Sequence, residues 1–205
     1  MIRARFQGPQ RRIGLTGGIA TGKSTVGQLL AGRFGLPVLD ADLYARGALA
    51  PGSPGALAVL DRYGAPVAAR AGGSIDRAAL GRIVFADALE RRWLEQLVHP
   101  LVRQRFEAEL QRLAPEAVVV LMIPLLFEAG LESLCSEVWL VTCRTETQLQ
   151  RLLRRDGLAE QEARARIAAQ WPLDRKQALA DRLINNDGDG EALEQQLAAA
   201  LALNP

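Results

Sequence analysis

A glycine-rich turn between two short apolar runs sets the architecture that this chain can adopt. Residues 12–16 form an apolar run that stops at two glycines, and residues 24–34 then carry apolar side chains at helical spacing. A second short apolar run follows at residues 36–40. A strand, a glycine loop, a helix and a second strand within about 30 residues are typical of a βαβ unit. The sequence therefore predicts an α/β fold in which a parallel sheet carries helices on its faces.

Three further apolar runs complete the expected sheet. Residues 117–123 and 137–143 are nearly continuous apolar runs, the kind that a parallel sheet buries on both faces. Residues 183–185 form a last short strand, and residues 192–203 have the spacing of a terminal amphipathic helix. We therefore expect a parallel five-stranded sheet flanked by helices.

The stretch between the second and third expected strands interrupts this core. Residues 76–113 show helical spacing with no strand pattern, so we expect a helical insertion over residues 51–111 that stands off the sheet. The core would then consist of residues 1–50 and 112–205. Within the core, a cation-rich helical stretch at 144–182 has the character of a lid.

Composition is consistent with one domain and its insertion. The chain has 205 residues, of which 49% are hydrophobic, so it can bury a substantial aliphatic core. A net charge of +2 does not indicate a nucleic acid or membrane partner, and the longest apolar run, at 118–127, is too short to span a bilayer. Cys135 and Cys143 lack metal-ligand spacing and suit a reducing compartment, so we expect a cytoplasmic protein. The sequence indicates no particular oligomeric state.

The glycine turn itself matches a phosphate-binding motif. The sequence from Gly17 to Ser24 fits the P-loop pattern GxxxxGK[ST] at every fixed position. In such a loop, backbone N–H groups converge on the phosphates, and the positive end of the following helix dipole faces the same anion. The alternative is a turn that only joins a strand to a helix, but the flanking strand and helix favour nucleotide binding. We expect ATP to contact Gly17, Gly18, Ala20, Thr21, Gly22, Lys23, Ser24 and Thr25.

Lys23 stands out in a chain that uses arginine for almost every cation. Among 25 basic residues, only Lys23 and Lys176 are lysines. A lysine enters such a loop as a compact charge on a flexible stem, whereas the broad guanidinium fork of arginine does not. We therefore expect Lys23 to reach the β- and γ-phosphates as a catalytic residue. The hydroxyl of Ser24 is expected to ligate Mg²⁺.

Asp40 and Asp42 supply acidic groups at the end of the second expected strand. The carboxyl ends of parallel strands face the ligand crevice, and alternation along an extended chain points both side chains the same way. Acids at such a place hold Mg²⁺ or accept a proton from an attacking hydroxyl. A helix N-cap at Asp42 is the alternative interpretation.

Two classes of P-loop protein compete at this point, a small-molecule kinase and a switch or motor that acts on macromolecules. A GTPase would carry a base-reading segment of the NKxD type, which the sequence lacks. A motor ATPase usually ends a strand in an acidic residue, whereas the run at 118–124 ends in proline. These observations favour the small-molecule kinase.

Several motifs occur in an order that resembles the dephospho-CoA kinase family. The resemblance runs from the P-loop to about Asn186 and rests on TGGIATGKS, LDADLYAR at 39–46, His99-Pro100, PLLFE at 124–128 and the Arg151…Arg155-Asp156 pattern. The P-loop alone is generic, and the ordered set is much more specific. The resemblance implies transfer of the γ-phosphate of ATP to the ribose 3′-hydroxyl of dephospho-CoA. The alternative is another P-loop small-molecule kinase of the nucleoside, nucleotide or shikimate type.

The resemblance also implies roles for individual residues. It makes Asp42 the expected base for the acceptor hydroxyl, and the helical insertion the expected acceptor domain. Asp40, deeper on the strand, is then expected to hold the metal. Tyr44 and Arg46 follow the acid pair and are expected to meet the acceptor. By its pattern alone His99, the only histidine, suits a helix end or the core. The resemblance implies that it contacts substrate or holds the acceptor domain in place.

Two arginines and an asparagine complete the expected nucleotide site. Arg151 and Arg155 lie one turn apart on one helix face, where a closing lid would bring them to the charge of the transition state. Asn185 follows the last strand at the carboxyl edge of the sheet, where it contacts adenine or only forms a turn. Ala20 stands where the family more often has glycine. Alanine is tolerated at this position if its φ is negative.

Overall fold

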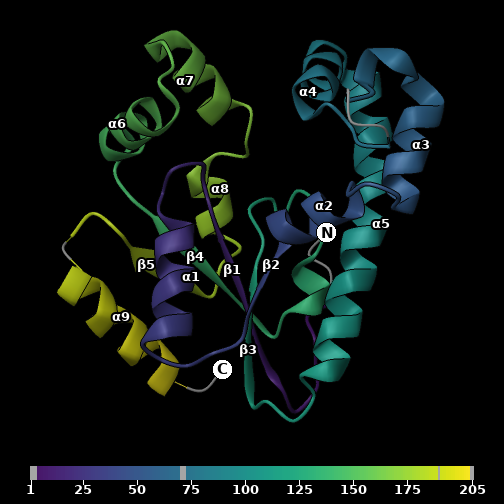
Figure 1. The fold of residues 1–205 in the computed structure, drawn as a ribbon. Helices are drawn as coiled ribbons and strands as arrows, with labels where there is room; N and C mark the ends of the chain where they lie inside the picture. Colours follow the sequence, from purple (N-terminus) through teal and green to yellow (C-terminus); the bar gives the residue numbers. More distant parts are fainter. Residues whose placement is uncertain (1–3, 70–72, 189, 204–205) are drawn as a thin grey trace. The chain divides into compact units, whose positions relative to one another are not determined.

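The computed structural model describes residues 4–69, 73–188 and 190–203. The chain forms two compact units. One unit holds the chain up to Asp40 and from Leu113 onward, and the other spans Ala41–Arg112. Figure 1 shows the helices and strands of both units.

The first unit is built on a five-stranded parallel sheet, which confirms the fold class predicted from the apolar runs. The strands lie in the order β2-β3-β1-β4-β5, so β1 occupies the centre. A 3₁₀ turn, η2 Glu132–Leu134, precedes β4. The strands are β1 Arg11–Gly17, β2 Val38–Asp40, β3 Val118–Met122, β4 Glu137–Thr142 and β5 Arg182–Asn185.

Apolar side chains of two helices cover one face of this sheet. The helices are α1 Lys23–Gly32 and α9 Gly190–Ala202. They pack on the strands in a cluster that includes Leu30, Trp139 and Leu197, each 0% exposed. Burying a large apolar side chain stabilises a fold by about 1.5–3 kcal/mol. The cluster therefore holds α1, and with it the preceding glycine loop, against the central strand.

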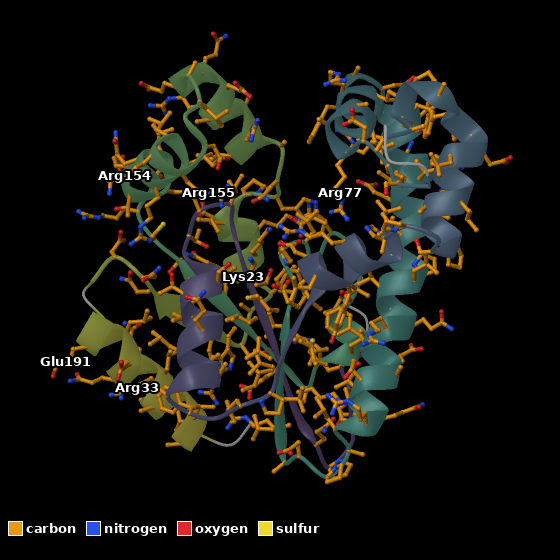
Figure 2. The ribbon with its side chains drawn as sticks, in the orientation of Figure 1. Lys23, Arg33, Arg77, Arg154, Arg155 and Glu191 are labelled. Atoms are coloured by element: carbon orange, nitrogen blue, oxygen red, sulfur yellow. The ribbon has the colours of Figure 1, made fainter. Side chains whose placement is uncertain are left out.

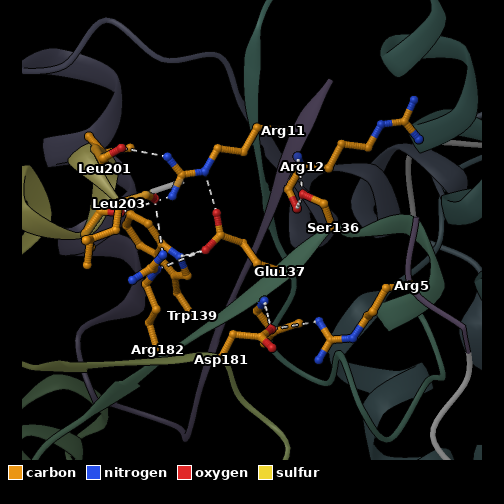
Figure 3. A network of polar contacts seen from close by, with 12 residues as sticks. Arg5, Arg11, Arg12, Ser136, Glu137, Trp139, Asp181, Arg182, Leu201 and Leu203 are labelled. Atoms are coloured by element: carbon orange, nitrogen blue, oxygen red, sulfur yellow. Dashed lines mark hydrogen bonds and ion pairs between the residues drawn. The ribbon is translucent and has the colours of Figure 1, made fainter. Parts of the chain in front are cut away.

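A buried carboxylate ties the sheet to the last helix. Glu137, at the start of β4, accepts hydrogen bonds from Arg11 and Arg182, as Figure 3 shows. Trp139 Nε1 donates a third at 2.9 Å. Arg11 also donates to the Leu201 carbonyl of α9 at 2.7 Å. Burial alone would raise the pKa of the Glu137 carboxyl, but the three donors outweigh it and hold that pKa below its ordinary value.

Three helices follow β4 within the expected lid region. They are α6 Thr145–Asp156, α7 Glu160–Ala168 and α8 Leu173–Gln177. Gly157 caps the C-terminus of α6, and its φ of 65° lies in the left-handed region that favours glycine. Leu149 and Leu152 of α6 form a small apolar cluster with Ala163 of α7, and Ile19 and Ala20 of the glycine loop pack against it.

The second unit is a helical cluster. Its elements are α2 Ala41–Ala48, α3 Pro54–Tyr63, the 3₁₀ turn η1 Ala65–Val67, α4 Arg77–Ala86 and α5 Ala88–Arg112. The side chains of Ser53 and Asp76 cap the first turns of α3 and α4. Leu80 and Val84 lie in the apolar core of the unit. Over the described residues of the whole chain, no helix combines the length and the apolar character needed to cross a membrane.

The start of the helical unit differs from the sequence-based expectation. The sequence-based argument that Asp40 and Asp42 point the same way requires the chain to stay extended through Asp42. In the structure, β2 ends at Asp40 and α2 begins at Ala41. The alternation argument is therefore wrong, because ADLYARGA at 41–48 is rich in helix formers and carries its acid in the first turn, where the helix dipole favours it. α2 packs on α5, so the compact unit begins at Ala41, ten residues before the boundary expected from composition. The role of this unit in acceptor binding stays a prediction.

Candidate active site

The glycine loop forms a compact turn between β1 and α1. Gly22, directly before Lys23, has a φ of 94°. A Cβ at Gly22 would lie 1.8 Å from Asn186 Nδ2, so only glycine fits there. Thr21 Oγ1 donates to the Gly18 carbonyl at 2.9 Å and closes the turn from within. The loop is thus held in a defined conformation at the N-terminus of α1.

The start of α1 brings three expected nucleotide contacts together. Lys23, Ser24 and Thr25 are the first three residues of the helix. The amides of a first helical turn lack intrahelical acceptors, and the helix dipole places positive charge at the same end. Lys23 is half-buried, while Ser24 and Thr25 are exposed. Figure 2 shows Lys23 at this end of α1. The arrangement is chemically suited to bind an anion such as a phosphate.

Ala20 has a backbone conformation that residues other than glycine rarely adopt. Its φ is 58°, and among the described residues it is the one non-glycine residue with a positive φ. The condition under which alanine would be tolerated here, a negative φ, is therefore not met. A left-handed conformation costs an L-residue roughly 1–2 kcal/mol because Cβ approaches the following carbonyl oxygen. The loop thus carries local backbone strain at Ala20.

Two side chains from segments far along the chain hold the Thr21 carbonyl. Asn186 Nδ2 donates to it at 2.9 Å, and Arg151 Nη1 donates at 3.4 Å. Arg151 Nη2 also donates to the Asn186 carbonyl at 2.9 Å. The structure therefore brings Arg151, an expected catalytic residue, against the P-loop. Asn186 joins it there, although no motif singles this residue out.

Asn185, the expected adenine contact, lies beside this arrangement and not within it. Its N–H donates to Gln196 Oε1 at 3.0 Å, and its Oδ1 accepts from the Asp187 N–H at 2.9 Å. Asn185 is exposed, whereas Asn186 is buried. Side chains at a strand end point alternately to opposite sides, so one of two adjacent asparagines faces the loop, but the sequence does not say which. A contact between Asn185 and adenine stays a prediction.

Two glutamines hold the peptide groups on either side of Ile19, a loop residue that the motif leaves open. Gln148 Nε2 donates to the Ile19 carbonyl at 2.7 Å. The Ile19 N–H donates to Gln170 Oε1 at 2.8 Å. Gln148 belongs to α6, and Gln170 lies between α7 and α8. The two glutamines lie 129 and 151 residues from Ile19, so nothing in the local sequence pairs them with the loop.

The second lysine of the chain is buried beside the PLLFE motif. Lys176 Nζ lies 2.7 Å from Glu128 Oε1, and the Lys176 side chain is 0% exposed. The same glutamate oxygen accepts a hydrogen bond from the Trp171 N–H at 3.3 Å. This ion pair ties the residues that lead into α8 to the segment that follows β3.

Arg155 is placed differently from Arg151, although both belong to α6. Arg155 Nε donates to Asp156 Oδ1 at 2.7 Å, and the arginine side chain is 56% exposed. This hydrogen bond raises the pKa of Arg155 and lowers the pKa of Asp156. Figure 2 shows Arg155 on α6, near Arg154. The structure thus records Arg155 in a surface ion pair, and its role in catalysis stays a prediction.

The expected metal ligands are hard oxygen donors. Ser24 is the second residue of α1 and is exposed, and Asp40 ends β2, in register with Met122 of β3. In the part of the chain that the structure describes, no group of three or more His, Cys, Asp and Glu side chains is arranged to hold a metal ion. Mg²⁺ keeps several waters and takes few protein ligands, so a hydroxyl and a carboxylate suit it without such a group. Asp42, the expected base, is exposed in the first turn of α2, in the helical unit.

The helical unit contains a pocket of about 600 Å³ formed by α2, α5 and the start of α3. Tyr44, an expected acceptor contact, lines it together with Leu101, Gln104 and Arg105. Tyr44 packs edge-on against Phe106, with ring centroids 5.0 Å apart, and the Arg105 guanidinium lies 5.8 Å from the Tyr44 ring centroid. The pocket thus combines apolar walls with one cation and one amide.

The other two expected acceptor contacts lie outside the lining of this pocket. Arg46 is exposed on α2, and its backbone carbonyl accepts from Arg77 Nη2 at 3.0 Å. His99 is exposed in the interior of α5, which continues through Pro100. The expectation of a helix end or a core position for His99 is therefore wrong, because α5 accommodates the proline internally. Substrate contacts of Arg46 and His99 stay predictions.

Comparison with known proteins points to one family. The family model described as dephospho-CoA kinase matches residues 11–192. The dephospho-CoA kinase of Synechococcus sp. (strain CC9605) is 61% identical over 196 residues, which cover 96% of this chain and 94% of that protein. The dephospho-CoA kinase of Gloeobacter violaceus is 52% identical over 192 residues, which cover 94% of this chain and 92% of that protein.

Solved structures agree in fold over nearly the whole chain. A crystal structure of a Thermus thermophilus protein superposes with a TM-score of 0.82 at 39% identity, covering 96% of this chain and 99% of the other. A dephospho-CoA kinase from Campylobacter jejuni superposes with a TM-score of 0.69 at 27% identity, covering 93% of this chain and 95% of the other.

Proposed function

The chain belongs to the dephospho-CoA kinase family, and from this premise we propose how its own residues carry out the reaction. The enzyme uses ATP to phosphorylate the ribose 3′-hydroxyl of dephospho-CoA, which gives coenzyme A and ADP in the last step of coenzyme A synthesis. The match across residues 11–192 carries this conclusion and favours it over a nucleoside, nucleotide or shikimate kinase.

In our proposal, the triphosphate of ATP binds in the loop from Gly17 to Thr25. The compact loop, the position of the loop at the N-terminus of α1 and the half-buried Lys23 support this placement. Lys23 would meet the β- and γ-phosphates, where its positive charge offsets the charge that spreads over the phosphoryl oxygens. Asn185 would contact the adenine from the edge of β5.

Ser24 and Asp40 would hold Mg²⁺ in this proposal. Their hydroxyl and carboxylate oxygens are the donors that this ion prefers. When bound, the ion neutralises charge on the phosphates and orients them for transfer. Ser24 would also contact the triphosphate as part of the loop.

The acceptor would bind to the helical unit. The pocket beside Tyr44 supports this, because its apolar walls suit an aliphatic arm and its arginine and glutamine suit amides or phosphates. Arg46 and His99 are exposed and available to a larger acceptor that extends beyond the pocket. All three contacts are proposals for this chain.

Asp42 is the proposed general base. Its carboxylate would accept the proton of the acceptor 3′-hydroxyl while that oxygen forms a bond to the γ-phosphorus of ATP. The bond from the γ-phosphorus to the β,γ-bridging oxygen breaks, and ADP leaves with the electron pair. Arg151 and Arg155 would stabilise the transferring group in the transition state, and the place of Arg151 against the P-loop supports its part.

A coupled ADP-release assay tests this function directly. The purified protein should turn over ATP rapidly with dephospho-CoA and slowly with nucleoside monophosphates, with shikimate or with no acceptor. Phosphorus NMR of the product should place the new phosphate on the ribose 3′-oxygen. Ready use of a nucleoside monophosphate with no turnover of dephospho-CoA would contradict the proposal. We also propose that the enzyme is cytoplasmic, since its two cysteines suit a reducing compartment, and that it needs no nucleic acid or membrane partner.

A further inference from the structure

The peptide between Ile19 and Ala20 is held in an orientation that its own backbone does not prefer. Ala20 has a φ of 58°, a region that L-residues rarely adopt. A half-turn of this peptide plane would bring the φ of Ala20 to negative values. The same half-turn would swing the Ile19 carbonyl away from Gln148, whose Nε2 donates to it at 2.7 Å. The hydrogen bond from Gln148 therefore opposes the movement that would relieve Ala20.

Gln170 fixes the preceding peptide. Its Oε1 accepts from the Ile19 N–H at 2.8 Å, so both peptide planes next to Ile19 are held by side chains. Strained backbone persists only where its surroundings over-determine it, and two such bonds on one residue provide this. Gln148 is 3% exposed, so water does not compete freely for its amide.

A buried ion pair holds the segment that carries Gln170. The next residue, Trp171, donates its N–H to Glu128, and Glu128 pairs with the fully buried Lys176 at 2.7 Å. The chain on the C-terminal side of Gln170 is thus anchored to the segment after β3. This anchoring gives Gln170 a defined position, and it assigns a structural purpose to the second lysine.

The orientation of this peptide matters for phosphate binding. The carbonyl and the N–H of a trans peptide point in opposite directions, and the described chain contains no cis peptide bond. Because the Ile19 carbonyl points to Gln148, the N–H of Ala20, in the same peptide, points away from Gln148. In a P-loop, such N–H groups bind the phosphates.

We propose that Gln148 and Gln170 are positioning residues that clamp the Ile19 backbone and so orient the Ala20 N–H toward the phosphates of ATP. They act through the loop and do not touch the reacting atoms. The inference rests on the proposed function only in taking ATP as the ligand of this loop. Because the two glutamines flank α7, the clamp also couples the loop to the lid.

Equilibrium binding of ATP in the absence of acceptor tests the clamp. Gln148→Met and Gln170→Met keep the side-chain length and remove the hydrogen bond. Each should weaken ATP binding roughly three- to tenfold, the fold-change that corresponds to one lost hydrogen bond. Gln161→Met, at an exposed position on α7, is the matched control and should bind ATP as the unmodified protein does.

Ala20→Gly provides a readout that a merely structural role would not move. Glycine adopts a positive φ without steric cost, so the loop no longer gains from flipping the peptide. Gln148→Met weakens ATP binding by some factor in the protein with Ala20. In the Ala20→Gly background, the factor for the same substitution should be less than half as large. Thermal unfolding measured alongside separates loss of fold from loss of binding, and the half-exposed Gln170 offers a second variant if the buried Gln148 variant is unstable.

Two results would overturn the clamp. One is unchanged ATP affinity in folded Gln148→Met and Gln170→Met proteins. The other is a loss of affinity from Gln148→Met that is equally large in the unmodified loop and in the Ala20→Gly background. Failure of the unmodified protein to phosphorylate dephospho-CoA, with the expected pattern of ATP affinities intact, would refute the proposed acceptor and leave the clamp standing.

Discussion

At the scale of single residues, Lys23 follows a glycine whose backbone has no room for a Cβ and opens α1 with a half-buried side chain. We predict that Lys23→Met lowers kcat by a factor on the order of 10²–10³, as removal of other preorganised charge-stabilising groups does. Lys23→Arg should fail almost as badly, because the planar guanidinium does not fit where the slim ammonium does. Arg33→Lys, at an exposed surface pair, is the control and should be neutral. Near-normal turnover by Lys23→Arg would contradict this explanation.

Asp40 and Asp42 are also separated by a prediction at this scale. Asp42→Asn keeps the size and removes the proton acceptor, so kcat should fall by a factor of roughly 10²–10⁴ while the dependence on Mg²⁺ changes little. Asp40→Asn should instead raise the Mg²⁺ concentration needed for half-maximal activity. Titration of Mg²⁺ in both variants measures this. A metal defect in Asp42→Asn but not in Asp40→Asn would mean that the two roles are exchanged.

At the scale of elements, α6 presents Arg151 to the P-loop and keeps Arg155 in a surface pair with Asp156. We predict that Arg155→Ala lowers kcat by at least tenfold and weakens ATP binding less, because an arginine that meets transition-state charge acts mainly on the chemical step and is worth about 10³ or more in the strongest cases. Arg154→Ala, the exposed neighbour, serves as the control. Loss of ATP affinity with unchanged kcat would reassign Arg155 to ground-state binding.

At the scale of the whole molecule, Glu137 joins β1, β5 and the end of α9 through Arg11 and Arg182. Its folded-state pKa lies below the ordinary value of 4.5, so its stabilisation is present above that value and is lost as the pH falls below it. We predict that Glu137→Gln lowers the free energy of unfolding at pH 7 by about 3 kcal/mol, the lower end of the range for a broken buried ion pair. The variant should also lose part of the acid sensitivity of unfolding. Urea unfolding at pH 7 and below pH 4.5 measures both effects, and equal losses at the two pH values would contradict the assignment.

The five strands and the nucleotide loop were predictable because each is encoded locally. Continuous apolar runs bounded by glycine or polar residues have few alternatives in a chain of this kind, and the observed β4 at Glu137–Thr142 ends within one residue of the expected run. The P-loop spacing likewise depends on residues that are adjacent in sequence. The ordered motifs from the loop to Asn186 were sufficient to indicate the family that the comparisons then showed.

Local sequence did not decide the features that arise between distant segments. The helix formers at 41–48 favour a helix after Asp40, but the place of this helix in the second compact unit depends on its packing against α5. The side chains that hydrogen-bond the Ile19 backbone come from glutamines 129 and 151 residues away, and the buried Lys176 finds its ion-pair partner in Glu128. Propensity and spacing act over a few residues along the chain. Side-chain hydrogen bonds and buried ion pairs depend on which residues the fold brings together, so only the folded chain reveals them.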